Sequence, residues 1–244
     1  MSNRALITGV GNKYEMTGGE LPPLKADIDL NEISDLLQIK NWDSIDHIDD
    51  NDKSFLDPAT NTVLIGDKLQ PTKENILKTI NDIIEIDPAT SNLLFYFTGH
   101  GLKVGGLFMV TYDEAYFSDM DTKHPPNSLL SDDSYINTIN ELLKKNEMLK
   151  VITVIDCCFA GCMIASAKQA NKFLDRHIIF CAVNAQLAAR GPDKAASFFT
   201  GNFCRAVKET HTYLELQNKI LSISGSFLPA ILLPNSFNNI VHPL

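Results

Sequence analysis

The feature that most constrains the fold of this chain is a set of short, nearly continuous apolar runs that alternate with segments of helical periodicity. Such alternation is typical of a mostly parallel sheet with helices on both faces, whose strands are buried on both sides. The sequence therefore predicts an α/β fold with about six strands. The predicted strands span residues 5–8, 63–65, 93–98, 151–155, 178–183 and 228–233.

Helical periodicity predicts four helices between these strands. Thr72 is a suitable N-cap for a helix over residues 73–85, in which isoleucines form one apolar stripe. A second helix begins at Asp132 and ends in lysines, whose charge the helix dipole favours at that end. Residues 29–38 and 199–208 are further helices, and the Asp-rich and Pro-rich segments 43–62 and 112–131 are predicted loops.

Composition and charge narrow the class of protein. With 244 residues and 44% hydrophobic content the chain can bury a large core, and we expect a single domain. A net charge of −9 opposes binding to phosphate backbones, so no nucleic-acid partner is expected. The first residues are too polar for a secretory signal and no apolar run is long enough for a membrane span, which predicts a cytoplasmic protein. Five cysteines, three of them crowded together, indicate reduced thiols.

Reactive side chains directly follow two of the predicted strands. His100 lies between two glycines after the strand 93–98, and Cys158 follows the strand 151–155. In open α/β sheets ligands bind beyond the carboxyl ends of strands, where a histidine can activate a thiol nucleophile. Taken alone, a histidine at a strand end is more often a solvated loop residue, and cysteines placed like Cys157 and Cys158 are more often small buried hydrophobes.

Three other kinds of site have weaker support. A zinc site at Cys158 and Cys162 lacks a second pair of ligands at a suitable spacing. Gly9 and Gly11 begin a dinucleotide-binding pattern, but its third glycine position is occupied by Tyr14. No phosphate-binding loop or serine elbow is visible in the chain.

Taken in order, Gly99-His100-Gly101 and Asp156-Cys157-Cys158-Phe159-Ala160-Gly161 resemble the two catalytic motifs of caspase-like cysteine peptidases, in particular metacaspases and their bacterial relatives. The separation of His100 from Cys158 is close to the roughly 50 residues of the caspase signature. Further similar segments are Ala5-Leu6-Ile7, residues 24–37, residues 71–76 and Ser197-Phe198-Phe199-Thr200. Phe159 and Ala160 stand where metacaspases commonly have His and Ser, and the approach to Asp29 is one residue shorter than usual.

The resemblance implies a caspase-like three-layer sandwich and a cysteine endopeptidase that takes protein or peptide substrates. Its single domain, residues 1–244, would comprise a large-subunit-like part (1–161) and a small-subunit-like part (177–244), joined by a short helical linker (162–176). Cys158 would be the nucleophile and His100 its proton-handling partner. The backbone N–H groups of Gly101 and Cys158 would hold the oxyanion.

The resemblance also implies a pocket for the residue before the scissile bond. Asp156 and Asp29 would line it, with a hydroxyl from Thr98, so that Arg or Lys is preferred there. The alternative for Asp156 is that it caps the helix that follows. The implied biological role is a regulated processing, defence or cell-death protease, and the rival is a non-catalytic interaction module that binds a regulatory protein partner.

Activation is left open by the sequence. Lys168, Lys172 and Arg176 in the linker are either self-cleavage sites or one solvated helix face. No cofactor or metal is expected. Calcium activation stays an alternative, because several aspartates supply oxygen atoms but match no known calcium loop; these are Asp113, Asp119, Asp121, Asp132 and Asp133.

Overall fold

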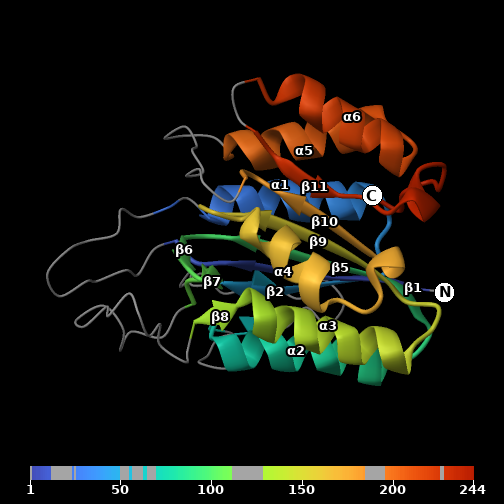
Figure 1. The fold of residues 1–244 in the computed structure, drawn as a ribbon. Coiled ribbons are helices and arrows are strands. Elements are labelled where there is room, and N and C mark those ends of the chain that lie inside the picture. The colour runs from blue at the N-terminus through green and yellow to red at the C-terminus, as the bar shows by residue number, and fades with distance from the viewer. Residues whose placement is uncertain are drawn as a thin grey trace, which may run out of the picture.

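A six-stranded sheet forms the middle layer of the molecule (Figure 1). The computed structural model describes residues 2–11, 24, 26–49, 70–111, 129–184, 196–225 and 228–244, and the backbone of 55–56 and 63–64. The strand order is β11-β10-β9-β5-β1-β2, and every neighbouring pair is parallel except β10 with β11. This confirms the predicted α/β class. The bounds are β1 (Ser2–Gly9), β2 (Ser44–Asp49), β5 (Thr90–Thr98), β9 (Lys150–Asp156), β10 (His177–Cys181) and β11 (Ala230–Leu232).

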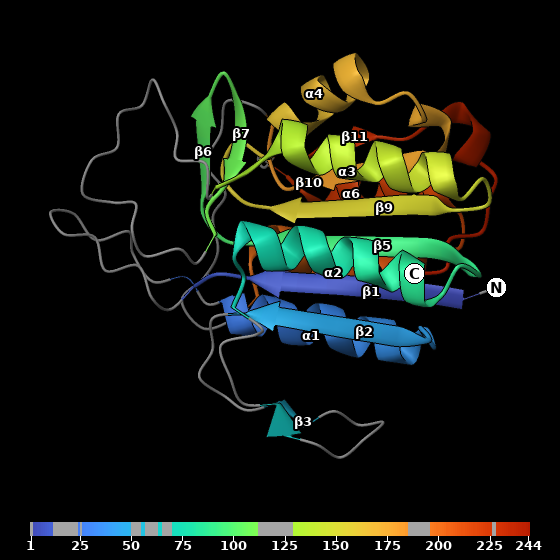
Figure 2. The same cartoon turned by 90° about the horizontal axis from the view of Figure 1, so that it is seen from below.

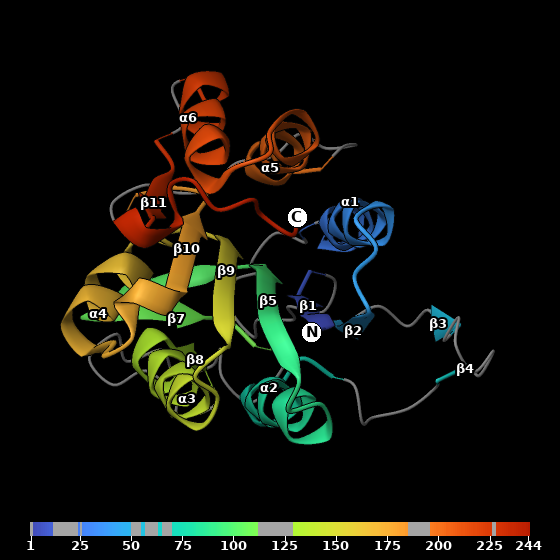
Figure 3. The same ribbon diagram turned by 90° about the vertical axis from the view of Figure 1, so that its right-hand side faces the viewer.

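Helices cover both faces of this sheet (Figures 1 and 3). One face carries α2 (Lys73–Ile86), α3 (Asp132–Lys145) and α4 (Cys162–Ala170), and the other carries α1 (Ala26–Ile39), α5 (Phe198–Glu209) and α6 (Tyr213–Ile223). Successive side chains of a strand point to opposite faces. In β5, Phe95 and Phe97 therefore enter the core under α2 and α3, while Leu94 and Tyr96 enter the core under α1 and α5.

The membership of the sheet differs from the prediction at one strand. Val63–Leu64 forms β4, which pairs with β3 (Phe55–Leu56) in a separate two-stranded sheet, so the described part of the predicted strand 63–65 does not belong to the main sheet. The sixth strand is β2, which lies inside the segment predicted as a loop. β2 is an edge strand that pairs only with β1 and is mostly half-buried. Such a strand does not need the continuous apolar run by which the other strands were identified.

The predicted helix ends agree with the structure at α2 and α3. The side chain of Thr72 accepts a hydrogen bond from Asn75 N at 3.1 Å, as an N-cap does. Lys144 and Lys145 lie in the last turn of α3. The sequence analysis missed α6, although its capping box of Thr212 and Glu215 is a recognisable start signal.

Strand register aligns the ends of β1, β5 and β9 at one edge of the sheet. Gly9 lies opposite Thr98, and Thr98 lies opposite Asp156. A small antiparallel sheet stands at the same edge (Figure 2). It consists of β6 (Gly101–Val104), β7 (Gly106–Met109) and β8 (Leu130–Ser131). Among the described residues, no helix has the length and apolar character needed to cross a membrane.

Candidate active site

The adjacent strands β5 and β9 bring His100 and Cys158 to the same edge of the sheet. Thr98 and Asp156 are paired at the ends of these strands, and the N–H of Gly99 donates to the carbonyl of Asp156 at 3.2 Å. His100 and Cys158 each follow two residues after these paired positions. Two residues that are distant in sequence are therefore held near each other by the sheet register.

The backbone after His100 packs directly against the backbone at Cys158. A Cβ atom added to Gly101 would overlap the carbonyl oxygen of Cys158 and lie 2.7 Å from Sγ of Cys157. Only glycine permits so close an approach. The carbonyl of His100 accepts a hydrogen bond from the N–H of Val110 at 3.0 Å. These contacts fix the backbone of His100 beside Cys158.

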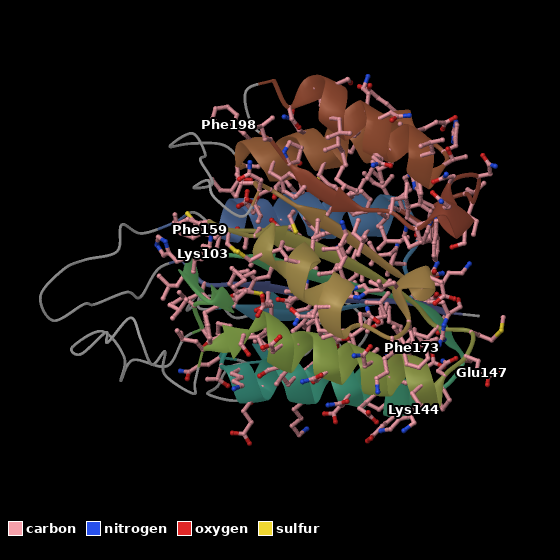
Figure 4. All side chains as sticks on the ribbon, viewed as in Figure 1. Lys103, Lys144, Glu147, Phe159, Phe173 and Phe198 are labelled. Atoms are coloured by element: carbon pink, nitrogen blue, oxygen red, sulfur yellow. The ribbon has the colours of Figure 1, made fainter. Side chains whose placement is uncertain are left out.

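The two adjacent thiols lie in different environments. Cys157 is fully buried, and burial raises the pKa of its thiol well above the usual value, whereas Cys158 is partly exposed. Phe159 has a φ of 59°, a left-handed conformation that is uncommon outside glycine and clusters at functional sites. Figure 4 shows Phe159 at the end of the molecule where β5 and β9 finish. Of the two thiols, Cys158 is the one that is accessible to solvent.

Asp29 and Asp156 lie in one hydrogen-bond network, together with Thr98. Asp29 is the fourth residue of α1, and its Oδ2 accepts a hydrogen bond from Thr98 Oγ1 at 2.8 Å. Its Oδ1 accepts from the backbone N–H of Ser197 at 2.7 Å, and Ser197 Oγ donates to Oδ2 of Asp156. All three predicted pocket residues are therefore close together, although the chain approaches Asp29 by a shorter route than usual.

Ser197 and Thr200 are site residues that the sequence analysis did not assign. Thr200 Oγ1 donates to Asp156 Oδ2 at 2.6 Å, and Ser197 is the N-cap of α5. The sequence contains a signal for this helix start, because Ser197 lies three residues before Thr200 at the beginning of a helical segment. The alternative that Asp156 caps the helix after it is wrong, because α4 has Gly161 as its N-cap and no side-chain cap bond.

The carboxylate pair is unusual in its electrostatics. Burial and the nearby charge of Asp156 raise the pKa of Asp29 to about 7, and burial raises the pKa of Asp156 as well. Neither carboxylate forms an ion pair with a Lys or Arg of the described part of the chain. A positively charged ligand would supply the missing counter-charge.

Asp132, one of the residues considered for a metal ion, accepts hydrogen bonds from its protein neighbours. Asp132 Oδ2 accepts hydrogen bonds from Leu107 N at 2.9 Å and from Ser166 Oγ at 2.7 Å, so it joins β7 and α4 to the start of α3. Asp113, Asp119 and Asp121 lie outside the described residues. Within the residues that the structure describes, no three His, Cys, Asp or Glu side chains are grouped so that they could hold a metal ion.

Comparison with protein-family models gives a match over most of the chain. The family model described as the caspase domain matches residues 2–223, which contain His100, Cys158, the carboxylate pair and Ser197. No curated protein matches the chain. The match extends over nearly the whole sheet, and of its six strands only β11 lies beyond the matched range.

Proposed function

The chain belongs to the caspase domain family of cysteine peptidases, and from this premise we propose that it is an endopeptidase that cleaves proteins after Arg or Lys by means of Cys158 and His100. The observation that carries the proposal is the contact of Gly101 with Cys158 beside a buried acidic pair. It combines a partly exposed thiol, a histidine whose backbone lies beside that thiol and a buried pair of carboxyl groups at one edge of the sheet.

The proposed reaction proceeds through an acyl-enzyme. The thiolate of Cys158 attacks the carbonyl carbon of the scissile peptide bond, and the resulting oxyanion accepts hydrogen bonds from the N–H groups of Gly101 and Cys158. The carbon–nitrogen bond then breaks while His100 gives a proton to the leaving amine. A water molecule next attacks the thioester and gives a proton to His100. Cleavage of the carbon–sulfur bond releases the acid and restores the thiolate.

Specificity for a basic side chain is inferred from the pocket. Asp29 and Asp156 present carboxylate oxygens close together in a buried setting, and Thr98 adds a hydroxyl. Carboxylates bind guanidinium groups through paired hydrogen bonds and bind ammonium groups as point charges. The same pair would repel the aspartate that caspases accept before the scissile bond.

Peptides that differ only in the residue before the scissile bond test this proposal. We expect cleavage after Arg and Lys and none after Asp, because the carboxylate pair attracts cations and repels anions. Cys158→Ala and His100→Ala should each abolish cleavage, whereas Cys157→Ala should keep it. Activity that persists in Cys158→Ala, or a preference for Asp, would contradict the proposal.

An electrophilic peptide ketone ending in Arg separates a peptidase from a non-catalytic interaction module. Mass spectrometry of the labelled protein should find the modification on Cys158, and Cys158→Ala should stay unlabelled. A wild-type protein that resists labelling under every condition would favour the module. The inferred role, a regulated processing, defence or cell-death protease with a regulatory partner, depends on the peptidase activity.

A further inference from the structure

The first turn of α5 joins the two carboxylates of the proposed pocket. The N–H of Ser197 donates to Asp29 at 2.7 Å, and its hydroxyl donates to Asp156. The hydroxyl of Thr200 also donates to Asp156, at 2.6 Å. Asp29 comes from α1 and Asp156 from the end of β9, and the turn between Ser197 and Thr200 contacts both.

The directions of these hydrogen bonds follow from their other partners. Ser197 Oγ accepts from the N–H of Thr200 at 3.0 Å, so its own proton is directed to Asp156. Thr200 Oγ1 lies 2.6 Å from the hydroxyl of Tyr96, which is fully buried and has its pKa raised by that burial. The phenol of Tyr96 therefore stays protonated and donates to Thr200, which in turn donates to Asp156. Every group that the turn presents to the carboxylates is a donor.

The position of the turn adds to this effect. Ser197 is the N-cap of a 12-residue helix, whose N-terminal end carries a partial positive charge. Hydrogen bonds to the charged form of a carboxylate lower its pKa, and they oppose the effect of burial at this pair. The turn thus favours the ionised pair that a cationic side chain requires.

We propose that Ser197 and Thr200 are positioning residues that determine the selectivity for a basic residue before the scissile bond. They act through Asp29 and Asp156, which they hold in fixed relative positions and whose ionised form they stabilise by hydrogen bonds. The inference rests on the proposed function, because it concerns the same pocket.

Four other titratable groups act on this pair among the described residues. They are Asp27 of α1, Tyr96 of β5, Cys157 beside Asp156 and Cys204 of α5. Burial raises the pKa of Cys204 to about 12 and raises the pKa values of Tyr96 and Cys157 well above their usual values, so these three groups stay neutral up to pH 9. His100 and Cys158 act on the scissile bond itself, so their contribution is the same for both peptides. A ratio of two peptides therefore isolates the pocket.

The test compares Ser197→Ala with wild type on two peptides, one with Arg and one with Gln before the scissile bond, between pH 6 and pH 9. At pH 7 we expect the ratio of kcat/KM for Arg to that for Gln to fall by about tenfold, mainly through KM, because a hydrogen bond to a charged group is lost. The ratio should recover as pH rises and the pair ionises. Ser197→Thr, which keeps the hydroxyl, should restore the wild-type profile.

Thr212→Ala is the matched control, because Thr212 caps the neighbouring helix α6 by the same kind of hydrogen bond. It should leave the peptide ratio unchanged. Where Ser197→Ala does not fold, Thr200→Val removes one donor to Asp156 and keeps the cap. An unchanged ratio and pH profile in a folded variant that has lost its donor would overturn the inference.

Carboxyl ¹³C NMR titration separates this inference from the proposed function. In Ser197→Ala the apparent pKa of the Asp29 and Asp156 pair should rise by about one unit, whether or not any peptide is cleaved. If wild type cleaves no basic peptide, the proposed function and the selectivity for a basic residue fail together, and the titration still decides whether Ser197 stabilises the ionised carboxylate pair. An apparent pKa that stays at the wild-type value would then reject it.

Discussion

At the scale of single residues, the backbone after His100 can pack against Cys158 only because position 101 has no side chain. A methyl group at Gly101 has no room beside Cys157 and Cys158, so the backbone after His100 must move away. Displacement of a catalytic group by about 1 Å can cost roughly a hundredfold in rate. We therefore expect Gly101→Ala to lose at least that factor in kcat/KM.

Gly201→Ala is the control for this prediction, because a Cβ at Gly201 in α5 meets no atom within 4 Å. It should keep full activity. Circular dichroism and thermal melting should show that both variants are folded. Wild-type kcat/KM in Gly101→Ala would mean that the close approach has no part in catalysis.

The pKa of Asp29 also predicts how stability depends on pH. Burial and the charge of Asp156 raise this pKa from 3.8 to about 7, so the folded state holds the proton more tightly than the unfolded state does. The resulting contribution to stability is fully present below about pH 4 and is lost as the pH rises through about 7. Urea denaturation without substrate should therefore give a lower free energy of unfolding at pH 8 than at pH 5.5.

Asp29→Asn should flatten this pH dependence, because asparagine does not titrate. Asp35→Asn, at an exposed position of the same helix, should keep the wild-type dependence. The same slope in Asp29→Asn as in wild type would assign the effect to other groups.

At the scale of elements, the segment that links β9 to β10 is held by side-chain contacts at its C-terminal end. Asn171 Nδ2 donates to Nδ1 of the buried His177 at 2.7 Å, so the proton on Nε2 is directed to Thr153 Oγ1 at 2.8 Å. Burial lowers the pKa of His177 to about 3, which keeps the imidazole neutral. Arg176 donates to the carbonyls of Leu143 and Asn146 at the end of α3.

Loss of the Arg176 side chain should therefore destabilise the fold. Arg176→Ala removes two hydrogen bonds made by a charged donor and the stacking of the guanidinium on Phe173. We expect the free energy of unfolding to fall by about 1 to 3 kcal/mol. Lys172→Ala, at an exposed position of the same segment, should change it by less than about 0.5 kcal/mol. Equal stabilities for the two variants in urea denaturation would contradict this account.

The elements also show how far the sequence predicts the fold. The strands β1, β5, β9, β10 and β11 are identifiable because they pack against helices and consist largely of apolar residues. β2 is not identifiable from the sequence in this way, because Asp46 and His47 interrupt its apolar pattern at the sheet edge. The positions of Cys158 and His100 follow from strand ends, whereas the role of Ser197 depends on contacts between α5, α1 and β9 that no local pattern contains.

At the scale of the whole molecule, the two proposed subunit-like halves share one sheet and one pocket. β9 and β10 are parallel neighbours over five residue pairs, and Asp156 of the first half bonds to Ser197 and Thr200 of the second. Burial of side chains from both halves in the same two cores opposes their separation. The described residues of the proposed site are therefore brought together in an uncut chain.

We expect the linker to be a poor substrate for self-cleavage, because a peptidase needs an extended and accessible segment. Lys168 lies within α4, and the N–H of Lys172 donates to Asn140 Oδ1 at 3.2 Å. The guanidinium of Arg176 is held against α3. Cleavage after any of these residues would first require local unfolding of the linker.

We accordingly expect the wild-type enzyme to cleave Arg peptides while it runs as one full-length band on a denaturing gel. A Lys168→Gln, Lys172→Gln double variant should have the same kcat/KM, since neither side chain takes part in activation. Samples taken at successive times during one incubation should each be analysed on the gel and assayed for activity. The contrary outcome has two parts. Activity would appear only as fragments cut within residues 162–176 accumulate, and the double variant would lack this activity. That outcome would show that the linker opens and that cutting it is the activating step.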